Sequence, residues 1–510
     1  MSSWLASAEG QRGLHAVAVV AVWLLLCAAI AIQRYRRQQR LYLPVVSGET
    51  PLLLCYASQT GFALRLAMQT AQSLQAAGQT VRLQSLGEVD LATLEATQRV
   101  LFVVSTTGEG DPPDTAIKFV RKFMGAAGNL QGLQYGLLAL GDHSYRHYCG
   151  FGRELERWLR HSGAQPLFDA VEVDNADEGA LRHWQHHLEG LGHGQPQPDW
   201  SVPQYSPWRL IERRLLNPDS LGGPAYHLAL KPMTELPAWR AGDIAEIGPR
   251  NAVQTVATAL QVLGMPAEML ANHDDRKETL ASFLAHRLLP QNAEDLRGLS
   301  LQQLRQSLKP LPHREYSIAS IPTDGQLELL LRQMQQGDGR LGLGSGWLTA
   351  HAAIGDEIAV RIRENPSFRP PIEERPLILI GNGTGMAGLR AHLKARVAAG
   401  HRRNWLLFGE RSASHDYFHR EEIERWQASG FLPRLDLAFS RDQAERRYVQ
   451  HCLREAADEL RRWVSDGACV YVCGSLQGMA PAVTAALNDI LGAAQVEQLL
   501  EEGRYRRDVY

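Results

Sequence analysis

The sequence has few of the features that mark nucleic-acid-binding or disulfide-stabilised proteins. Its 53 lysines and arginines are balanced by 55 aspartates and glutamates, which leaves a formal net charge of -2. A chain without excess positive charge is not expected to bind the phosphates of DNA or RNA. It has only six cysteines, and none shows the paired spacing of a zinc site. We therefore expect free thiols, no metal site and no nucleic-acid partner.

Long hydrophobic runs are also scarce, with one exception near the start of the chain. Leu14 to Ile32 is about 19 residues without a formal charge, long enough to cross a bilayer, and four arginines follow between residues 34 and 40. This pattern predicts a single-pass membrane protein whose later domains lie in the cytoplasm. The alternative is a cleaved signal peptide, or a lipoprotein signal ending at Cys27. The long apolar region and the positive charge on its C-terminal side disfavour it.

A chain of 510 residues is too long for one hydrophobic core, and about three domains are expected. Changes in composition and periodicity place the boundaries. The expected segments are an anchor at 1–45, an α/β domain at 50–190, a linker at 191–207 rich in Gly, Pro, Gln and His, a strand-rich domain with a short helical insert at 208–371, and a second α/β domain at 372–510.

A glycine-rich turn near residue 383 organises the last of these domains. The apolar run Pro376–Ile380 predicts a buried strand, and Leu389–Ala395 predicts a helix. Between them, Gly383, Thr384 and Gly385 form a turn at the helix N-terminus, where free N–H groups and partial positive charge favour a pyrophosphate. A glycine-rich turn alone is weak evidence for a nucleotide site, so the prediction depends on the motifs elsewhere in the chain.

Three loops of the first α/β domain each follow an apolar strand, where open α/β sheets bind ligands. The first loop enters a helix without the lysine of a triphosphate-binding loop, which favours a monophosphate. The second is glycine-rich, and the third carries Tyr145, an aromatic face for stacking a planar ring. The residues singled out are Ser58, Gln59, Thr60, Gly61, Ala63, Thr106, Thr107, Gly108, Tyr145 and Cys149.

The middle and last domains carry two further motifs. Arg314, Tyr316 and Ser317 lie in a predicted strand, where alternation places the first two on one face, suited to a pyrophosphate and a ring. In the last domain, hydroxyl, guanidinium and aromatic groups after a strand suit a 2′-phosphate with an adenine stacked nearby. An acidic residue there would indicate NAD. The residues concerned are Ser440, Arg441, Arg446, Tyr448 and Gln450.

Taken in order, these motifs resemble those of the diflavin reductase family over about residues 50–510. The resemblance implies a flavodoxin-like FMN domain, an antiparallel FAD-binding barrel with a small helical insert, and a ferredoxin-reductase-type NADP-binding α/β domain. It implies that the three loops bind FMN and that Arg314, Tyr316 and Ser317 bind FAD. It places Gly344, Ser345, Trp347 and Leu348 at the FAD pyrophosphate.

The resemblance also implies the catalytic residues. The last residues, from Arg504 to Tyr510, are similar to the end of the sulfite reductase flavoprotein subunit, in which the terminal aromatic covers the FAD ring. Tyr510 would be a gate for nicotinamide. Ser317, Cys473 and Asp508 would form the polar cluster around the hydride path.

Electrons are then expected to pass from NADPH to FAD, to FMN and to an external one-electron acceptor. The anchor favours a haemoprotein or a membrane-associated iron system as that acceptor. A flavoprotein subunit of an assimilatory sulfite reductase is the alternative. A non-catalytic flavin-binding membrane subunit is a third possibility, disfavoured by the retained catalytic cluster.

The sequence departs from the family in three places. Only about sixty residues separate Pro249 from Arg314, where relatives carry a larger helical lobe. Thr107 stands where some relatives have an aromatic. Asn382 and Gly388 replace prolines common in relatives, which predicts a looser glycine turn.

Overall fold

The computed structural model describes residues 51–59, 61–107, 110–142, 147–174, 176–191, 199–200, 204–271, 278–365, 368–371 and 373–510. The chain divides into two compact units, residues 1–195 and 196–510. The predicted anchor and much of the predicted linker lie outside the described residues.

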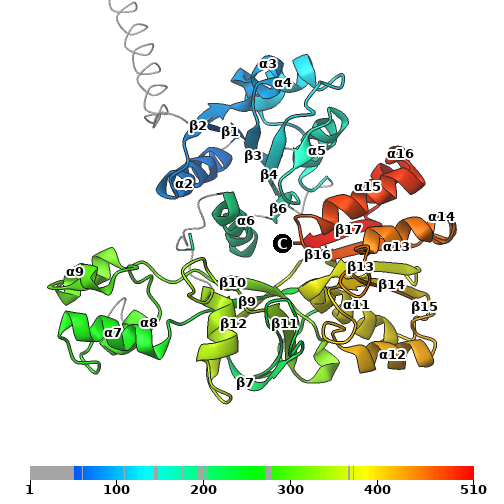
Figure 1. Cartoon of the computed structure of the whole chain (residues 1–510). Helices are drawn as coiled ribbons and strands as arrows, with labels where there is room; N and C mark the ends of the chain where they lie inside the picture. Colours follow the sequence, from blue (N-terminus) through cyan, green and yellow to red (C-terminus); the bar gives the residue numbers. More distant parts are fainter. Residues whose placement is uncertain are drawn as a thin grey trace, which may run out of the picture. The chain divides into compact units, whose positions relative to one another are not determined.

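The first unit is built on a parallel sheet with the strand order β2-β1-β3-β4-β5, in which β6 also pairs with β4 (Figure 1). Its central strands are almost wholly apolar and buried, as expected for a sheet covered on both faces. The strands are β1 (Leu52–Ala57), β2 (Val81–Ser85), β3 (Arg99–Ser105), β4 (Gln134–Gly141), β5 (Gln165–Pro166) and β6 (Val171–Asp174).

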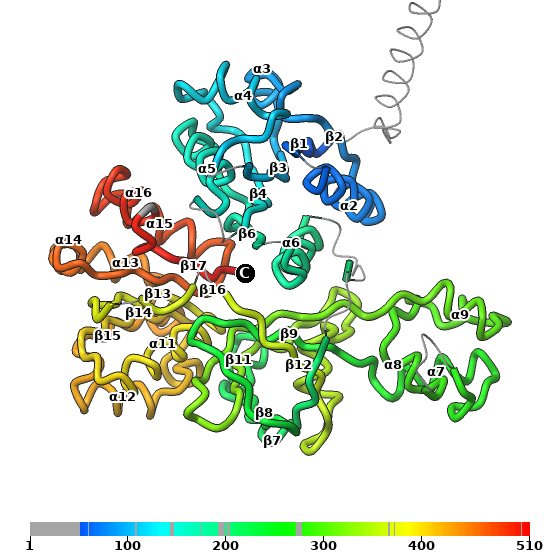
Figure 2. Tube along the Cα trace, turned by 180° about the vertical axis from the view of Figure 1, so that it is seen from behind, coloured from blue at the N-terminus to red at the C-terminus, as the bar shows by residue number. Residues whose placement is uncertain are grey.

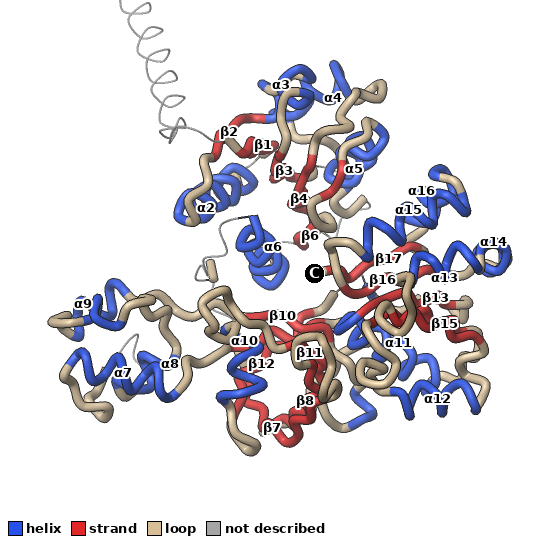
Figure 3. The backbone as a smooth tube through the Cα atoms, viewed as in Figure 1, coloured by secondary structure: helices blue, strands red, loops and turns tan. Residues whose placement is uncertain are grey.

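Helices cover both faces of this sheet (Figure 3). One core joins the sheet to α4 and α5, and α2 and α6 pack together through the contact of Trp184 with Thr70. The helices are α2 (Phe62–Ala76), α3 (Leu91–Glu95), α4 (Asp114–Phe123), α5 (Gly150–His161) and α6 (Glu178–Leu191). This is the flavodoxin-like arrangement expected from the sequence.

The second unit begins with an antiparallel sheet of order β10-β9-β12-β7-β8-β11. A bridge between Ile318 and Leu329 joins its two ends, so the sheet closes into a barrel. Alternate residues fill the interior, among them Trp208, Leu230 and Val360. The strands are β7 (Ser206–Leu215), β8 (Ala225–Pro232), β9 (Ile244–Gly248), β10 (Arg314–Ser317), β11 (Leu327–Arg332) and β12 (Glu357–Arg363).

A small helical lobe is inserted between β9 and β10 and has its own apolar core (Figure 2). It contains α7 (Val253–Leu263), α8 (Leu280–Ala285) and α9 (Leu301–Ser307). A short α10 (Leu343–Gly346) lies between β11 and β12.

The last part of the second unit is a parallel sheet of order β15-β14-β13-β16-β17. One core packs α11 and α12 on one face, and another packs α13 to α16 on the other. The strands are β13 (Leu377–Asn382), β14 (Asn404–Glu410), β15 (Arg434–Phe439), β16 (Cys469–Gly474) and β17 (Tyr505–Val509). The helices are α11 (Met386–Ala398), α12 (Arg420–Ala428), α13 (Val449–Glu455), α14 (Ala457–Ser465), α15 (Met479–Leu491) and α16 (Ala493–Glu501).

The predicted transmembrane helix finds no support in this fold. Leu14–Ile32 lies outside the described residues, and within the described ones no helix is both long and apolar enough to cross a membrane.

Candidate functional site

The first loop of the flavodoxin-like unit is held by hydrogen bonds to α4. The Ser58 N–H donates to Thr115 Oγ1 at 2.8 Å, and the Gly61 N–H donates to Ser58 Oγ at 3.0 Å. Gly61 has a φ of 91°, in the left-handed region that glycine adopts without strain. The Gln59 amide exchanges two hydrogen bonds of 2.9 Å with Asp114. The loop therefore presents a fixed backbone turn at the start of α2, whose first turn includes the buried Ala63.

The second and third loops leave the same edge of the sheet. The backbones of Thr107 and Asp111 exchange two hydrogen bonds, and the Thr107 hydroxyl also donates to the Asp111 carbonyl. Thr106 Oγ1 is buried without a hydrogen-bond partner among the described residues. Cys149 caps α5 with a φ of 50°, and its thiol donates to the Ala139 carbonyl at 3.3 Å. Burial, followed by the nearby Glu172, raises the pKa of Cys149 to about 12, so the thiol is neutral. Thr60, Gly108 and Tyr145 lie outside the described residues.

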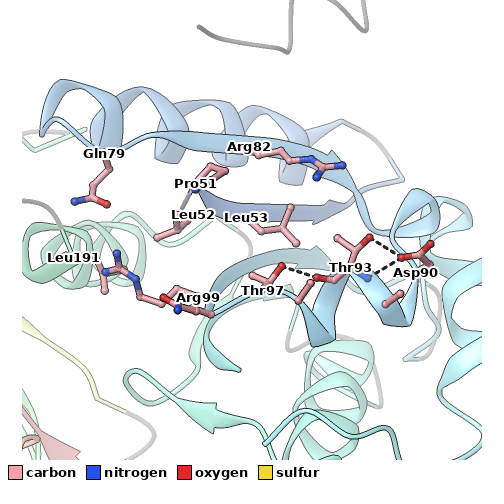
Figure 4. Close-up of a pocket in the computed structure, with 13 residues that line it drawn as sticks. Pro51, Leu52, Leu53, Gln79, Arg82, Asp90, Thr93, Thr97, Arg99 and Leu191 are labelled. Carbon is pink, nitrogen blue, oxygen red and sulfur yellow. Dashed lines mark hydrogen bonds between the residues drawn. The ribbon is translucent and has the colours of Figure 1, made fainter. Parts of the chain in front are cut away.

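A cavity of about 910 Å³ lies at the opposite edge of this sheet, where the strands begin (Figure 4). Pro51, Leu52 and the two arginines Arg82 and Arg99 line it. Ligands of open α/β sheets bind at the carboxyl ends of the strands. The cavity is therefore distinct from the predicted flavin loops.

In the barrel, β10 packs directly against the glycine turn that contains α10. A Cβ added to Gly344 would lie 2.5 Å from Tyr316 Oη and 2.8 Å from Arg314 Cβ. Both side chains thus share the face of β10 that meets this turn. Burial raises the pKa of the Tyr316 hydroxyl, which keeps it protonated. Only glycine leaves room for the backbone to approach this closely.

The residues after Gly344 are anchored to the barrel. Ser345 Oγ accepts a hydrogen bond of 3.0 Å from the Met334 N–H, and Leu348 is fully buried. Trp347 is buried beneath the Arg250 guanidinium, whose carbon lies 5.8 Å from the ring centroid. Trp347 Nε1 has no hydrogen-bond partner among the described residues. A buried donor left without an acceptor is costly unless a ligand supplies one.

Four predicted residues from distant parts of the sequence meet where the barrel joins the second α/β domain. Ser317 Oγ donates to Asp508 Oδ2 at 2.7 Å, and Cys473 Sγ lies 3.6 Å from the same oxygen. The Tyr510 hydroxyl lies close to Thr384 and Ser317. These residues come from β10, the glycine turn, β16 and the segment containing β17.

Burial sets the protonation of this cluster. It raises the pKa of Cys473 well above its ordinary value, and the Asp508 carboxylate adds to the shift. Burial likewise raises the pKa of Tyr510, whose hydroxyl is enclosed although the residue as a whole is half exposed. At neutral pH the cluster therefore offers a thiol and a phenol. The Cys473 group is neutral and is not a nucleophile.

The glycine turn is locked to the end of β16. A Cβ on Gly385 would lie 2.1 Å from the Cys473 carbonyl oxygen, and Gly383 has a φ of 56°. Asn382 Oδ1 accepts a hydrogen bond of 2.9 Å from the Ser475 N–H. The asparagine predicted to loosen the turn instead ties it to the neighbouring loop.

The predicted 2′-phosphate residues follow β15. Ser440 is buried, and its N–H donates to the Glu410 carbonyl at 2.9 Å. Arg441 and Arg446 are exposed and form no ion pair within the described residues. Tyr448 is 40% exposed and Gln450 is half-buried. Helix α13 begins at Val449, so Arg446 and Tyr448 precede it.

One ion pair at the glycine turn was not predicted from the sequence. Arg332, the last residue of β11, pairs with Glu410 at the end of β14 and also donates to the Gly223 carbonyl. Both side chains lie within 4.0 Å of the position a Gly383 Cβ would occupy. The available signal was an arginine at the end of a largely apolar strand, but its partner Glu410 lies 78 residues away in the sequence.

A buried charge network stands behind β10. His313 Nδ1 lies 2.7 Å from Asp199 Oδ1, and His313 Nε2 lies 3.3 Å from Glu315 Oε1. Arg363 pairs with Glu315 at 3.0 Å. Although Glu246, His313 and Glu315 are close enough to hold a metal ion, arginines already pair with both glutamates. This network ties the end of the linker to the strand with the predicted FAD residues.

The network predicts a stability that falls at alkaline pH. Burial opposes the charge of His313, but its bonds to Asp199 and Glu315 outweigh it and raise the pKa to about 9. Because the folded pKa exceeds the unfolded one, the stabilisation is complete below about pH 6.5 and is lost as the pH rises through about 9. We expect His313→Gln to lower the free energy of unfolding by about 2 kcal/mol at pH 6.5 and by much less at pH 10.

Denaturant unfolding followed by tryptophan fluorescence at both pH values checks this prediction. The exposed His351 provides a control, since His351→Gln should leave the pH profile unchanged. The prediction would be contradicted if the free energy of unfolding of the His313→Gln variant changed with pH in parallel with that of the unaltered protein.

A flavodoxin-like domain, a closed antiparallel barrel and a nucleotide-type α/β domain together define an electron-transferring flavoprotein oxidoreductase. Comparisons with known proteins agree. The flavodoxin family matches residues 54–184, and the oxidoreductase NAD-binding domain family matches residues 379–485.

Comparison with curated proteins gives the relatives. The chain is 30% identical to a sulfite reductase [NADPH] flavoprotein alpha-component of Vibrio cholerae, over 90% of this chain and 87% of that protein. The proteins of the same name from Neisseria meningitidis and Bacillus subtilis are 30% and 29% identical, over 89% and 92% of this chain and 88% and 90% of theirs. The chain belongs to the diflavin reductase family that contains these flavoproteins.

This membership confirms the predicted oxidoreductase class and the predicted cofactors FMN, FAD and NADPH. It also supports the sulfite reductase flavoprotein alternative better than a membrane-associated iron system.

The predicted membrane localisation is wrong. The relatives are sulfite reductase flavoproteins, and the part of the chain that the structure describes has no membrane-spanning helix. The prediction depended on the hydrophobic length of Leu14–Ile32, a criterion that takes no account of the rest of the chain.

Proposed function

We propose that this chain is the flavoprotein component of an NADPH-dependent sulfite reductase system. NADPH, FAD and FMN supply the redox chemistry when bound, taking two electrons from NADPH and passing them on singly. The chain's own residues bind, orient and shield these groups. The acceptor is a haemoprotein partner.

The Ser317–Asp508 hydrogen bond carries this proposal. It joins a barrel strand to the last strand of the nucleotide-type domain at 2.7 Å, with Cys473 and Tyr510 beside it. Because the Ser317 hydroxyl donates its hydrogen bond to Asp508, the serine oxygen can still accept one from an amide donor such as a nicotinamide carboxamide. We assign Ser317, Cys473 and Asp508 to positioning the nicotinamide and Tyr510 to gating it.

The three loops of the first unit are proposed to bind FMN. Ser58, Gln59, Thr60, Gly61 and Ala63 form or flank the phosphate turn, and Thr106, Thr107, Gly108, Tyr145 and Cys149 form the ring site. The buried Thr106 hydroxyl, which lacks a partner among the described residues, supports a polar ring edge there.

The face of β10 and the α10 turn are proposed to bind FAD. Tyr316 supplies a stacking face, and Arg314 supplies positive charge for the pyrophosphate beside Gly344, Ser345 and Leu348. The buried Trp347 N–H, left without an acceptor among the described residues, supports this assignment.

NADPH is proposed to lie over the glycine turn. Gly383, Thr384 and Gly385 accommodate the pyrophosphate, and Ser440, Arg441, Arg446, Tyr448 and Gln450 select the 2′-phosphate and stack the adenine. Arg332, held by Glu410 beside Gly383, is available to the same pyrophosphate.

The test uses the full chain with its flavins. Released FMN and FAD are quantified, and the reduction of cytochrome c is followed with NADPH and with NADH. Sulfite-dependent oxidation of NADPH is then measured after adding a sulfite reductase haemoprotein component. The proposal expects equal FMN and FAD, selectivity for NADPH, and sulfite-dependent turnover only when the haemoprotein is present.

Each step has a contrary result. FAD without FMN would reject the assigned FMN loops. Loss of flavin absorbance without cytochrome c reduction would reject transfer to an external acceptor. Fast cytochrome c reduction without sulfite-dependent turnover would retain the diflavin reductase and reject the sulfite reductase partner.

A further inference from the structure

The last helix of the flavodoxin-like unit, α6, carries a pair of histidines outside the loops discussed above. His183 and His187 are four residues apart, so their side chains lie on one face of the helix, one turn apart. Their Nε2 atoms are 3.2 Å apart, and both residues are half-buried. Two imidazole nitrogens therefore converge on one point beside the helix.

This separation matches the distance between two imidazole nitrogens that bind the same metal ion. An ion bound to imidazole nitrogens at about 2.0–2.1 Å, with an N–metal–N angle between square and tetrahedral values, holds those nitrogens about 2.8–3.4 Å apart. The observed 3.2 Å falls in this range. An ion could enter with only a small outward rotation of the rings.

Packing holds the pair in place. The His187 ring stacks on Phe168, with centroids 4.2 Å apart and planes 2° from parallel. Phe168 packs edge-on against Trp184, whose indole N–H donates to Thr70 at 3.0 Å. A ligand ring already fixed by its neighbours loses little side-chain entropy on binding.

We propose that His183 and His187 form a binding site for a divalent transition-metal ion of the class that prefers imidazole, such as Cu²⁺, Ni²⁺ or Zn²⁺. Water completes the coordination, since neither residue is fully buried. The ion joins two turns of α6 and so stabilises the helix that ends this domain. The spacing of the cysteines could not indicate this site, because both of its donors are histidines.

The competing interpretation is a hydrogen bond between two neutral rings, which the same distance allows. Affinity separates the two interpretations. We expect the oxidised, flavin-loaded full chain to bind one equivalent of Cu²⁺ in calorimetry. The first equivalent should show an electron paramagnetic resonance signal with two imidazole nitrogens. Linking two ligands makes the second bond intramolecular, so His183→Gln should weaken this binding at least about tenfold.

His187→Gln is the second variant, and His161→Gln on α5 is the matched control. His161 lies in the same unit and bonds to the Arg157 carbonyl, away from the pair. Flavin content monitors folding of each variant. The proposal is overturned if the His183→Gln and His187→Gln variants bind like the control. A single-nitrogen signal from the unaltered protein would also overturn it, whether or not the variants fold.

Discussion

Asp508→Ala is expected to lower kcat for NADPH-dependent cytochrome c reduction about 100-fold. The carboxylate accepts a hydrogen bond from Ser317 and faces the Cys473 thiol, so its loss releases both groups at once. Hydrogen bonds to a charged group contribute about 1.5–3 kcal/mol, and each 1.4 kcal/mol is tenfold in rate. The measurement is steady-state kinetics normalised to FAD content, which separates a catalytic defect from lost flavin.

Two comparisons sharpen this prediction. Asp489 on α15 pairs with Arg454 at the surface, so Asp489→Ala should leave kcat unchanged. Ser317→Ala combined with Asp508→Ala should cost little more than Asp508→Ala alone, because the two residues act through one hydrogen bond. A kcat within twofold of the unaltered protein would show that this bond does not serve the reaction.

Arg441→Ala is expected to raise KM for NADPH about 50-fold while leaving kinetics with NADH unchanged. The guanidinium follows β15 next to the buried Ser440, and a charge-assisted bond to a 2′-phosphate is worth about 1.5–3 kcal/mol. NADH lacks that phosphate and cannot lose the interaction. Initial rates over a range of both nucleotides give the two KM values.

The chain provides a matched control six residues away. Arg447 lies on the same exposed segment, but its guanidinium pairs with Glu455 at 2.5 Å. Arg447→Ala should therefore change neither KM. Equal increases for NADPH and NADH in the Arg441→Ala variant, or an equal effect in the Arg447→Ala variant, would exclude the phosphate role.

Local patterns predicted individual strands and turns, whereas the folds of the three domains came from the family resemblance. The apolar run Pro376–Ile380 predicted the strand Leu377–Asn382, because a sheet covered on both faces needs continuous apolar strands. Strand alternation placed Arg314 and Tyr316 on one face, and the structure brings both against Gly344. The convergence of Ser317, Cys473 and Asp508 came from the family resemblance, since no local pattern links residues 191 positions apart.

The features that could not be predicted from the sequence depend on contacts between residues far apart in the chain. The Arg332–Glu410 pair forms across the boundary between the barrel and the last domain. The role of Asn382 depends on Ser475, a residue 93 positions away. The error about the membrane had a different origin, a length rule applied to one isolated segment.

The backbone around Tyr510 restricts the kind of movement by which its ring can be displaced. Its N–H donates to the Gly474 carbonyl, and its main-chain oxygen accepts from the Leu476 N–H, both at 3.0 Å. With the main chain held on both sides, displacement of the ring requires rotation about side-chain bonds. Such rotations occur in picoseconds to nanoseconds where a side chain is partly exposed, far faster than typical turnover. In the proposed gating role, the opening of Tyr510 is then a rapid pre-equilibrium, and its effect on kcat depends on the open fraction and not on an opening rate.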